Sequence, residues 1–236
     1  MKRFFVSTSV YALAHQLGQA GAIEDFKRQL DATDKNSLPV VRTIRRFRAL
    51  ELELVLHVDG GATYIGMARS RAFHEALKSE LPWISLDDDI EVTTDCVAAM
   101  AAALDDVEPR IVLAPYYTRD NDNPKLTFTV PIVRSETTRN GAKLLLLPKG
   151  AGGGFGFVGM NRPAMKAIVD DAGEELSWFD HGEKKLALFY EALEDGLWFG
   201  EDTSFFRYRV PARVTVEALL TGSILHAGVR LDLGTI

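Results

Sequence analysis

Three consecutive aspartates, Asp87 to Asp89, follow the stretch WISL, which has the pattern of a buried strand. Like charges this close raise each other's pKa and repel, so they must lie in water or around a cation. In an extended backbone, Asp87 and Asp89 would share one face and Asp88 would take the other. Two carboxylates at the carboxyl end of a strand suit a divalent metal, which prefers oxygen ligands. The alternative is a solvated turn that caps the following helix.

Two arginines, Arg69 and Arg71 in GMARSRAFHEAL, stand near the start of a predicted helix. Cations there oppose the helix dipole, whereas a bound phosphate would be attracted by both the helix terminus and the arginines. Pairing with nearby carboxylates such as Asp59 or Glu75 is the alternative. The residues alone leave both interpretations open.

The segment Gly152–Gly156 holds four glycines in five positions, which permits positive φ and a close approach of a ligand to the backbone. It lacks both the Gly-Lys-Ser/Thr and the Gly-x-Gly-x-x-Gly patterns of phosphate-binding loops. A mobile loop beside a substrate and a plain surface turn are therefore both compatible with it.

Two further candidates lie near the C-terminal end of the chain. Glu201 and Asp202 follow a glycine and precede a helix-like run. Acids at such a place either stabilise the first helical turn or act as a general base near an acceptor hydroxyl. His226 follows an apolar run, and a lone histidine is more often packed or solvated than a ligand. As a third metal ligand, its neutral imidazole would move the preference from Mg²⁺ toward Mn²⁺.

Alternating strand and helix patterns are expected to position these side chains. The strand-like runs are Arg3–Ser9, Leu52–Val58, Trp83–Leu86, Ile111–Tyr117, Leu126–Val133 and Lys143–Leu147. The helical patterns are Ala68–Glu80, Thr93–Leu104, Arg162–Asp171 and Lys184–Leu193. This alternation predicts a mostly parallel sheet with helices on both faces, mixed in its middle region, 113–147. The weakest signals are 31–47, a loop followed by a possible helix, and 120–124, a turn.

Composition bounds the class of protein. The 236 residues are enough for one large α/β domain or two small ones. The net charge is −6, the pI is near 5.4, and no polybasic run suggests a nucleic-acid or membrane patch. The single cysteine, Cys96, excludes a disulfide framework and a cysteine zinc cluster. A cytoplasmic location is therefore expected.

The segment MKRFFVSTSVYALAH combines a basic start with an apolar stretch, as a signal peptide does. Three hydroxyl residues, Ser7–Ser9, interrupt that stretch, so a first core strand followed by a loop is the preferred interpretation. No run approaches the roughly 20 apolar residues of a transmembrane helix, and no integral membrane segment is expected.

The order of the motifs is more specific than any one of them. ARSRA, WISLDDDI, GGGFGFVGMNRPAM, GEDTSFF and LHAG form a series that resembles the GT-A glycosyltransferase superfamily. The resemblance spans Ala68 to about Gly228. It implies an α/β GT-A (Rossmann-like) fold, with a mixed, mostly parallel sheet flanked by helices. It also implies a single domain over 1–236, with a nucleotide-sugar-binding half, 1–110, and an acceptor and catalytic half, 111–236.

The resemblance assigns a donor site. Asp87 and Asp89 match the DxD pair that holds the metal in the family, so both are expected at the metal, with Asp89 as its direct ligand and Asp87 also facing the ribose or sugar. Asp88 would point elsewhere, toward the nucleoside or a structural partner. His226 matches the late histidine that completes the coordination of Mn²⁺ or Mg²⁺. Arg69 matches an arginine that lies near the donor pyrophosphate.

The resemblance also assigns catalytic residues. Gly153 and Gly154 match the glycine-rich loop at the donor sugar and acceptor. Glu201 and Asp202 match the xED motif, whose aspartate is the catalytic base of inverting members. The implied activity is transfer of a sugar from a nucleoside-diphosphate sugar, expected to be a UDP-sugar, to a hydroxyl of a saccharide. The family's early TP after the first strand reads STSVY here, and its uracil-binding side chains have no match.

Three alternatives stay open. The acceptor could be a modified base in DNA, as in phage-type enzymes. The acidic pI argues against DNA, because phosphate contacts dominate such affinity, unless Val41–Arg48 forms a basic face. A sugar nucleotidyltransferase would carry a glycine-rich loop with a basic residue after the first strand, and STSVYALAH has neither. A non-catalytic nucleotide- or carbohydrate-binding module would not need both acidic motifs.

Overall fold

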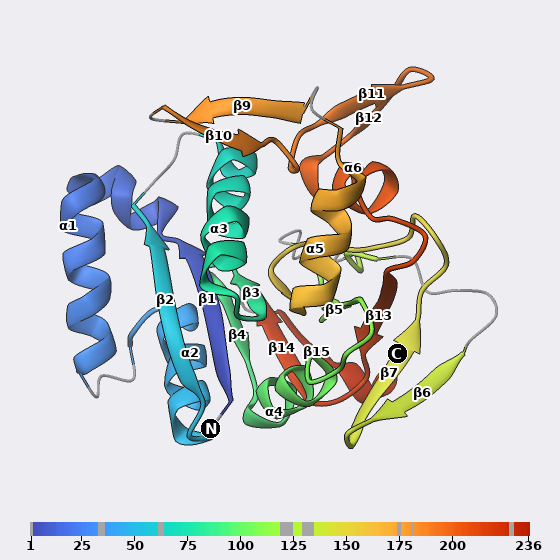
Figure 1. The fold of residues 1–236 in the computed structure, drawn as a ribbon. Coiled ribbons are helices and arrows are strands. Elements are labelled where there is room, and N and C mark those ends of the chain that lie inside the picture. Colours follow the sequence, from blue (N-terminus) through green and yellow to red (C-terminus); the bar gives the residue numbers. More distant parts are fainter. Residues whose placement is uncertain are drawn as a thin grey trace.

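The computed structural model describes residues 2–32, 36–60, 64–118, 125–128, 135–173, 176–180, 182–226 and 229–236. Its main sheet is built from β1 (Arg3–Ser9), β2 (Glu53–Asp59), β3 (Trp83–Leu86), β5 (Arg110–Leu113), β6 (Glu136–Arg139), β7 (Ala142–Leu146), β8 (Phe157–Met160) and β13 (Thr215–Leu219). These eight strands stand in the order β2-β1-β3-β8-β5-β13-β7-β6 (Figure 1). Strands from both of the predicted halves therefore share one sheet.

Strand direction in this sheet is mixed. β1 pairs in parallel with β2 and β3, and β5 pairs in parallel with β13. The other four pairings are antiparallel: β8 with β3 and β5, and β7 with β13 and β6. The α/β class is confirmed, but the expected balance toward parallel strands is wrong. The reason is that β8 runs antiparallel to both of its neighbours. The β6–β7 hairpin adds two more antiparallel pairings at one edge of the sheet.

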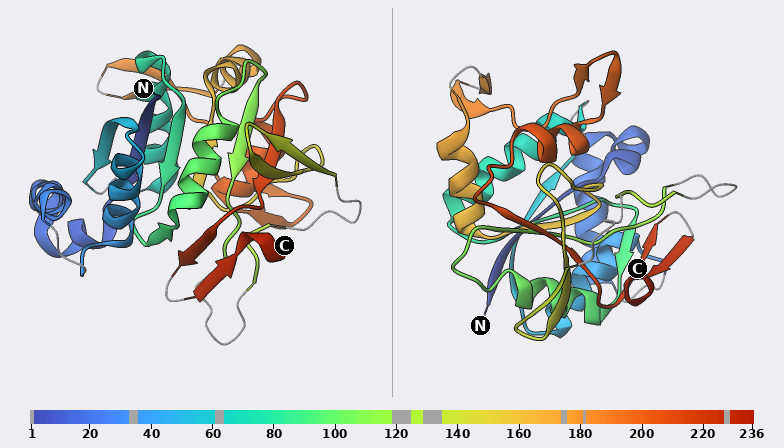
Figure 2. Two further views of the ribbon diagram at one scale, coloured as in Figure 1. Left: turned by 90° about the horizontal axis from the view of Figure 1, so that it is seen from below. Right: turned by 90° about the vertical axis from the view of Figure 1, so that its right-hand side faces the viewer.

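Helices cover both faces of the sheet (Figures 1 and 2). One apolar cluster includes side chains of α1 (Tyr11–Asp31), α2 (Pro39–Ala49) and α4 (Thr94–Ala103), and a second includes side chains of α3 (Ile65–Ser79), α5 (Arg162–Asp171) and α6 (Glu201–Tyr208). In β3, Ile84 and Leu86 join the first cluster and Trp83 joins the second, as the two-residue period of a strand requires. Burial on both faces explains why three of the four residues of WISL are apolar and why all four are buried.

Three small sheets accompany the main one. β14 (Ser223–His226) pairs with both β15 (Val229–Asp232) and β4 (Ile90–Val92). A short 3-10 helix, η2 (Leu233–Thr235), follows β15. The β9–β10 hairpin (Ser177–Asp180 and Glu183–Leu186) and the β11–β12 hairpin (Ala192–Glu194 and Leu197–Phe199) lie beyond the upper ends of α3 and α6 in Figure 1. Because β4 directly follows the aspartate triplet, its pairing with β14 brings the end of β14 beside that triplet.

Most predicted elements are confirmed, with shifts of a few residues at their ends. β1, β2, β3, β5, β7, α3, α4 and α5 fall on predicted runs, and the uncertain basic run lies in α2. The long helix α1 replaces the loop expected after the first strand, while β8 and β13 lie outside every predicted run. In the described part of the chain, no helix is long and apolar enough to cross a membrane.

Two of the predicted elements differ from the structure. The predicted helix Lys184–Leu193 is wrong, because β10 covers its start and the Leu186 N–H donates to His74 Nε2 (2.7 Å). This tertiary contact with α3 overrides a local helical pattern. Of the predicted strand Leu126–Val133, the structure has one bridge, between Leu126 and Tyr117. Residues 129–133 and the predicted turn at 120–124 lie outside the described residues.

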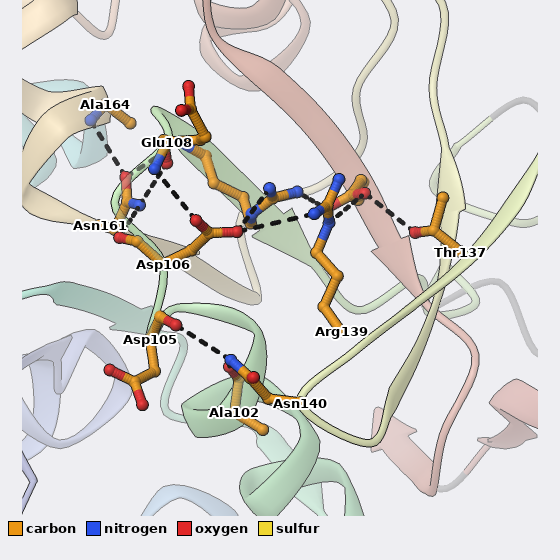
Figure 3. A network of polar contacts seen from close by, with 11 residues as sticks. Ala102, Asp105, Asp106, Glu108, Thr137, Arg139, Asn140, Asn161 and Ala164 are labelled. Carbon is orange, nitrogen blue, oxygen red and sulfur yellow. Dashed lines mark hydrogen bonds and ion pairs between the residues drawn. The ribbon is translucent and has the colours of Figure 1, made fainter.

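A buried polar network joins three strands of the sheet (Figure 3). Arg110 on β5 donates to Glu217 on β13, and each side chain is at most 1% exposed. Arg110 also pairs with Asp106 (2.8 Å), and Glu217 accepts from Thr137 and Arg139 on β6 (3.2 and 3.4 Å). Because Arg110 and Glu217 are held away from water, each depends on its partners for stabilisation.

Candidate active site

One buried arginine collects three carboxylates from distant parts of the chain. Arg69, in the second turn of α3, has a side chain that is 6% exposed. Its Nη1 donates to Glu201 (2.8 Å) and to Asp202, both in the first turn of α6, and its Nη2 donates to Asp87 behind β3 (3.1 Å). Burial alone would lower the pKa of Arg69, but the three carboxylates raise it above its usual value. Of the two interpretations of Arg69, the structure therefore shows pairing with carboxylates. The acids it pairs with lie further along the chain than Asp59 or Glu75, the partners expected from the sequence.

Asp202 is an acid of this cluster whose pKa is raised. Its Oδ1 accepts from Arg69, and its Oδ2 accepts from the backbone N–H of Phe155 (3.1 Å). Burial raises the pKa of Asp202 to about 6; Arg69 opposes this rise, while Glu201 and Asp87 add to it. The side chain remains 25% exposed. An acid with this pKa is suited to proton transfer near neutral pH.

The aspartate triplet forms a tight turn between β3 and β4. The Ile90 N–H donates to the Asp87 carbonyl (3.2 Å), and the Asp88 carbonyl accepts a hydrogen bond from the first turn of α2. The extended backbone expected from the sequence is therefore wrong at this point. Asp87 lies against the buried arginine, whereas Asp89 lies against a histidine. The triplet is a turn, as the alternative had it, but Asp87 and Asp89 are engaged by protein groups.

Asp89 and His226 meet with two acceptor atoms facing each other. The His226 Nδ1 lies 2.7 Å from the Tyr117 carbonyl oxygen. A carbonyl can only accept, so Nδ1 must carry the proton. The His226 Nε2 lies 3.2 Å from Asp89 Oδ2, and a neutral imidazole would present a lone pair to that carboxylate. A proton or a metal ion between them resolves the repulsion, and a backbone carbonyl on the far nitrogen is how metal-binding histidines are oriented.

Asp87, the third expected metal ligand, does not join this pair. It is held by Arg69 instead. Among the described residues, no group of three or more His, Cys, Asp or Glu side chains is arranged to hold a metal ion. The structure therefore brings together two of the three expected ligands, Asp89 and His226. A site with few protein ligands suits Mg²⁺ or Mn²⁺ when substrate phosphates complete the coordination.

The glycine-rich segment packs closely against aromatic side chains. A Cβ at Gly152 would lie 2.0 Å from the Phe206 ring, and a Cβ at Gly154 would lie 2.3 Å from the Tyr116 hydroxyl. Neither glycine has a positive φ. Glycine is therefore required here because the neighbouring side chains leave no room for a Cβ, and not because of the backbone conformation. The segment is thus a packed wall of the site and not a plain surface turn. The donor contacts expected at Gly153 and Gly154 stay a prediction.

Tyr116 belongs to the site although it lies in no recognised motif. Its hydroxyl accepts from the Gly156 N–H (3.3 Å), and its ring packs edge-on against His226 with 4.9 Å between centroids. Burial raises the pKa of Tyr116, and the charges of Asp87 and Asp202 raise it further, so the phenol stays protonated. The available signal was its place just after β5, since ligand-binding residues gather at the carboxyl ends of strands.

A small hollow, with room for about one water molecule, lies beside Arg69 and Asp87. It is bounded by the carboxyl ends of β1, β2 and β3 and by α3, where open α/β sheets bind ligands. Thr8 Oγ1 is buried there with no hydrogen-bond partner among the described residues. The other polar lining residues include Ser7, Ser9, His57 and Asp59.

The arginines of α2 are largely used within the fold. Arg42 and Arg46 pair with Glu91, and Arg45 donates to backbone carbonyls at the end of α1. Arg48 is exposed. Three of the four arginines between 41 and 48 are therefore already engaged, and the open basic face that DNA binding would need is not present in this helix.

Fold and site together define an α/β protein with a mixed sheet and an acidic, arginine-centred site at the carboxyl ends of its first strands. No protein-family model matches the chain, and no curated protein matches it. Similar solved structures include the crystal structure of A197 from STIV, at 13% sequence identity and a TM-score of 0.49. That similarity covers 98% of this chain and 94% of the other. The functional conclusion therefore rests on the geometry of the site.

Proposed function

We propose that this chain is a metal-assisted, inverting glycosyltransferase that moves a sugar from a nucleoside-diphosphate sugar to an acceptor hydroxyl. One observation carries the proposal: acids from separate elements converge with an arginine and a histidine near the carboxyl end of β3. These residues are Asp87, Asp89, Glu201, Asp202, Arg69 and His226. The set offers a carboxylate base beside a place for a cation and a diphosphate.

Asp202 is the proposed catalytic base. Its carboxylate accepts the proton of the acceptor hydroxyl while that oxygen forms a bond to the anomeric carbon. The bond from the anomeric carbon to the diphosphate oxygen breaks, and the electron pair leaves with the nucleoside diphosphate. Attack opposite the leaving group inverts the configuration. Glu201 shares Arg69 with Asp202 and adds to the rise in the pKa of Asp202, which makes that carboxylate a stronger base.

Asp89 and His226 fit Mn²⁺ or Mg²⁺, because an ion bound by both would relieve the repulsion between the carboxylate and the lone pair of a neutral imidazole. When bound, the ion supplies Lewis-acid stabilisation of the diphosphate leaving group. Asp87, held by Arg69, is proposed to face the ribose or sugar. A nucleoside is proposed to lie over the adjacent hollow at the ends of β1 and β2, where the Thr8 hydroxyl has no hydrogen-bond partner among the described residues, and uridine is the proposed nucleoside.

The proposed acceptor is a saccharide and not a base in DNA. The arginines of α2 that could have contacted phosphates are mostly paired within the fold. The net charge of −6 also opposes binding to a polyanion. The Asp88 carbonyl accepts a hydrogen bond from the start of α2, and its side chain is proposed to contact the nucleoside.

A donor screen tests the proposed function. UDP- and GDP-sugars are incubated with the protein and Mn²⁺, and release of nucleoside diphosphate is measured with and without saccharide acceptors. We expect release from at least one donor, stimulation by an acceptor, and inverted anomeric configuration in the product by NMR. Failure of every donor would refute the proposed function, and a retained configuration would refute the role of Asp202.

The pH dependence of turnover is a prediction of its own. We expect kcat/KM to rise with pH through about 6 and then level off, because burial raises the pKa of Asp202 to about 6 and only the ionised form accepts a proton. The contribution of Asp202 to the stability of the fold changes with pH in the opposite direction, falling as the pH rises. The fold favours the protonated carboxyl, so this contribution is present below the ordinary pKa of an aspartate and is lost as pH rises through about 6. A profile that is flat through this range would contradict the role as base.

Metal removal is a second prediction. EDTA should abolish transfer, and Mn²⁺ should restore it. His226→Gln should weaken Mn²⁺ binding by at least about tenfold, because the imidazole that faces Asp89 is lost. Free Mn²⁺ is measured by electron paramagnetic resonance, which needs no turnover. His15→Gln changes an exposed histidine of α1 and serves as the matched control. Transfer that is unchanged in EDTA would remove the metal from the mechanism.

A further inference from the structure

The two terminal nitrogens of the Arg69 guanidinium are occupied by carboxylates. Nη1 donates to Glu201 and Asp202, and Nη2 lies within 3.3 Å of both Asp87 oxygens. The Phe155 ring lies 5.2 Å from the guanidinium carbon, and the side chain is 6% exposed. The Nε atom is also buried. A diphosphate could therefore reach Arg69 only by displacing acids that already hold it.

We infer that Arg69 is a positioning residue that fixes Asp202 relative to Asp87 and keeps Asp202 ionised, in place of a contact to the donor diphosphate. This inference rests on the proposed function. A planar guanidinium presents a fixed fork of donors and can hold acids from two directions, whereas a lysine ammonium is a single point charge. Arg69 thereby joins the end of β3, on the donor side, to the start of α6, where the acceptor proton goes.

Groups from four elements determine the charge state of Asp202. Arg69 on α3 supplies a positive charge. Glu201 on α6 and Asp87, the residue just after β3, supply negative charges. Tyr116, which follows β5 in the chain, is neutral. A backbone N–H from the glycine-rich segment donates to the other carboxylate oxygen. Removing Arg69 leaves Asp202 among two anions in a poorly solvated place, which favours its protonated form.

The test compares Arg69→Met, Arg69→Lys and Arg71→Lys in the full chain. Arg71 is a matched control, since it lies two residues further along α3 and makes its two hydrogen bonds to Asp180 (2.8 and 2.7 Å). Titration of the Asp202 carboxyl by ¹³C NMR, assigned by its loss in Asp202→Asn, reports ionisation without turnover. Calorimetry with UDP and Mn²⁺ reports a diphosphate contact, and kcat reports positioning.

Arg69→Met is expected to raise the titration midpoint of Asp202 by about one to three pH units and to move the acidic limb of kcat with it. UDP affinity should stay close to that of the wild type. Arg69→Lys keeps one positive charge, so the midpoint moves less, but kcat still falls roughly 10- to 100-fold because the carboxylate is misplaced. Arg71→Lys should leave all three readouts unchanged.

A midpoint of Asp202 that stays unchanged in both Arg69 variants would overturn the inference. So would a loss of UDP affinity larger than the loss in kcat, which would assign Arg69 to the donor. If Arg69→Met does not fold by circular dichroism, Arg69→Lys decides through UDP affinity and kcat. If the wild-type chain transfers no sugar, the proposed function fails, while the NMR titration still shows whether Arg69 controls Asp202.

Discussion

Asp202→Asn is expected to lower kcat for sugar transfer by about 10²- to 10⁴-fold, the usual contribution of a positioned general base. The amide has the shape of the carboxylate, although its single oxygen can accept from only one of the two donors that the carboxylate serves, Arg69 and the Phe155 N–H. It cannot take a proton from the acceptor. Binding of UDP with Mn²⁺ should change little, because Asp89 and His226 are untouched. Nucleotide release under saturating donor measures the first effect, and calorimetry measures the second.

Stability distinguishes this result from simple damage to the fold. Burial disfavours the charged form of Asp202, so its replacement by a neutral amide should leave the free energy of unfolding unchanged or raise it near neutral pH. Arg69 keeps Asp87 and Glu201 as partners. Asp95→Asn also removes an acid from a first helical turn, in α4, and should leave kcat unchanged. If Asp202→Asn folds and turns over at the wild-type rate, another group is the base.

Glu217→Gln is expected to lower the free energy of unfolding by about 3 kcal/mol, the lower end of the range for a broken buried ion pair. Glu217 is fully buried and is the partner of Arg110, which is itself 1% exposed. Without the carboxylate, Arg110 is left with Asp106 alone (2.8 Å), and the donors Thr137 and Arg139 lose a charged acceptor. The lower end of the range applies because Arg110 keeps one partner.

Denaturant unfolding measures this loss. Glu136→Gln, at an exposed site on β6 of the same sheet, is the matched control and should change the stability by about 0.5 kcal/mol or less. The double variant Arg110→Met with Glu217→Leu should recover most of the loss, because apolar groups of similar volume often replace a buried pair without cost. A loss in Glu217→Gln no larger than in the control would show that the pair contributes little to the stability of the sheet.

Much of the scaffold is readable from local patterns. β1 and β3 are rich in aromatic and β-branched residues, such as Phe4, Phe5 and Val6 in β1 and Trp83 and Ile84 in β3, as is typical of strands. The acids Glu201 and Asp202 stand in the first turn of α6, where their charge stabilises the helix. Lys184–Leu193 has a helical pattern, yet its start lies in β10, where the Leu186 N–H donates to His74 Nε2, 112 positions away in the sequence. No local pattern contains that contact.

The position of β8 is equally unreadable from its own residues. It lies antiparallel between β3 and β5, although it comes after both in the chain. Gly159, in this strand, faces Met100 and Leu104 of the helix behind it, and a Cβ there would lie 2.6 Å from Met100 Sδ. The fit of a strand between two others depends on the whole core, so the sequence-based expectation of a mostly parallel sheet missed it.

The side chains that can do chemistry are recognisable from residue type and spacing alone. Asp87–Asp89, Glu201–Asp202 and His226 are candidates because few residue types hold a cation or accept a proton. Which of these side chains contact each other depends on the tertiary structure. Arg69 and Asp202 are separated by 133 positions, and an arginine's own surroundings in the sequence do not contain the acids it will find. Asp89 faces His226 because β4 pairs with β14 in one register, and burial across the fold sets that register.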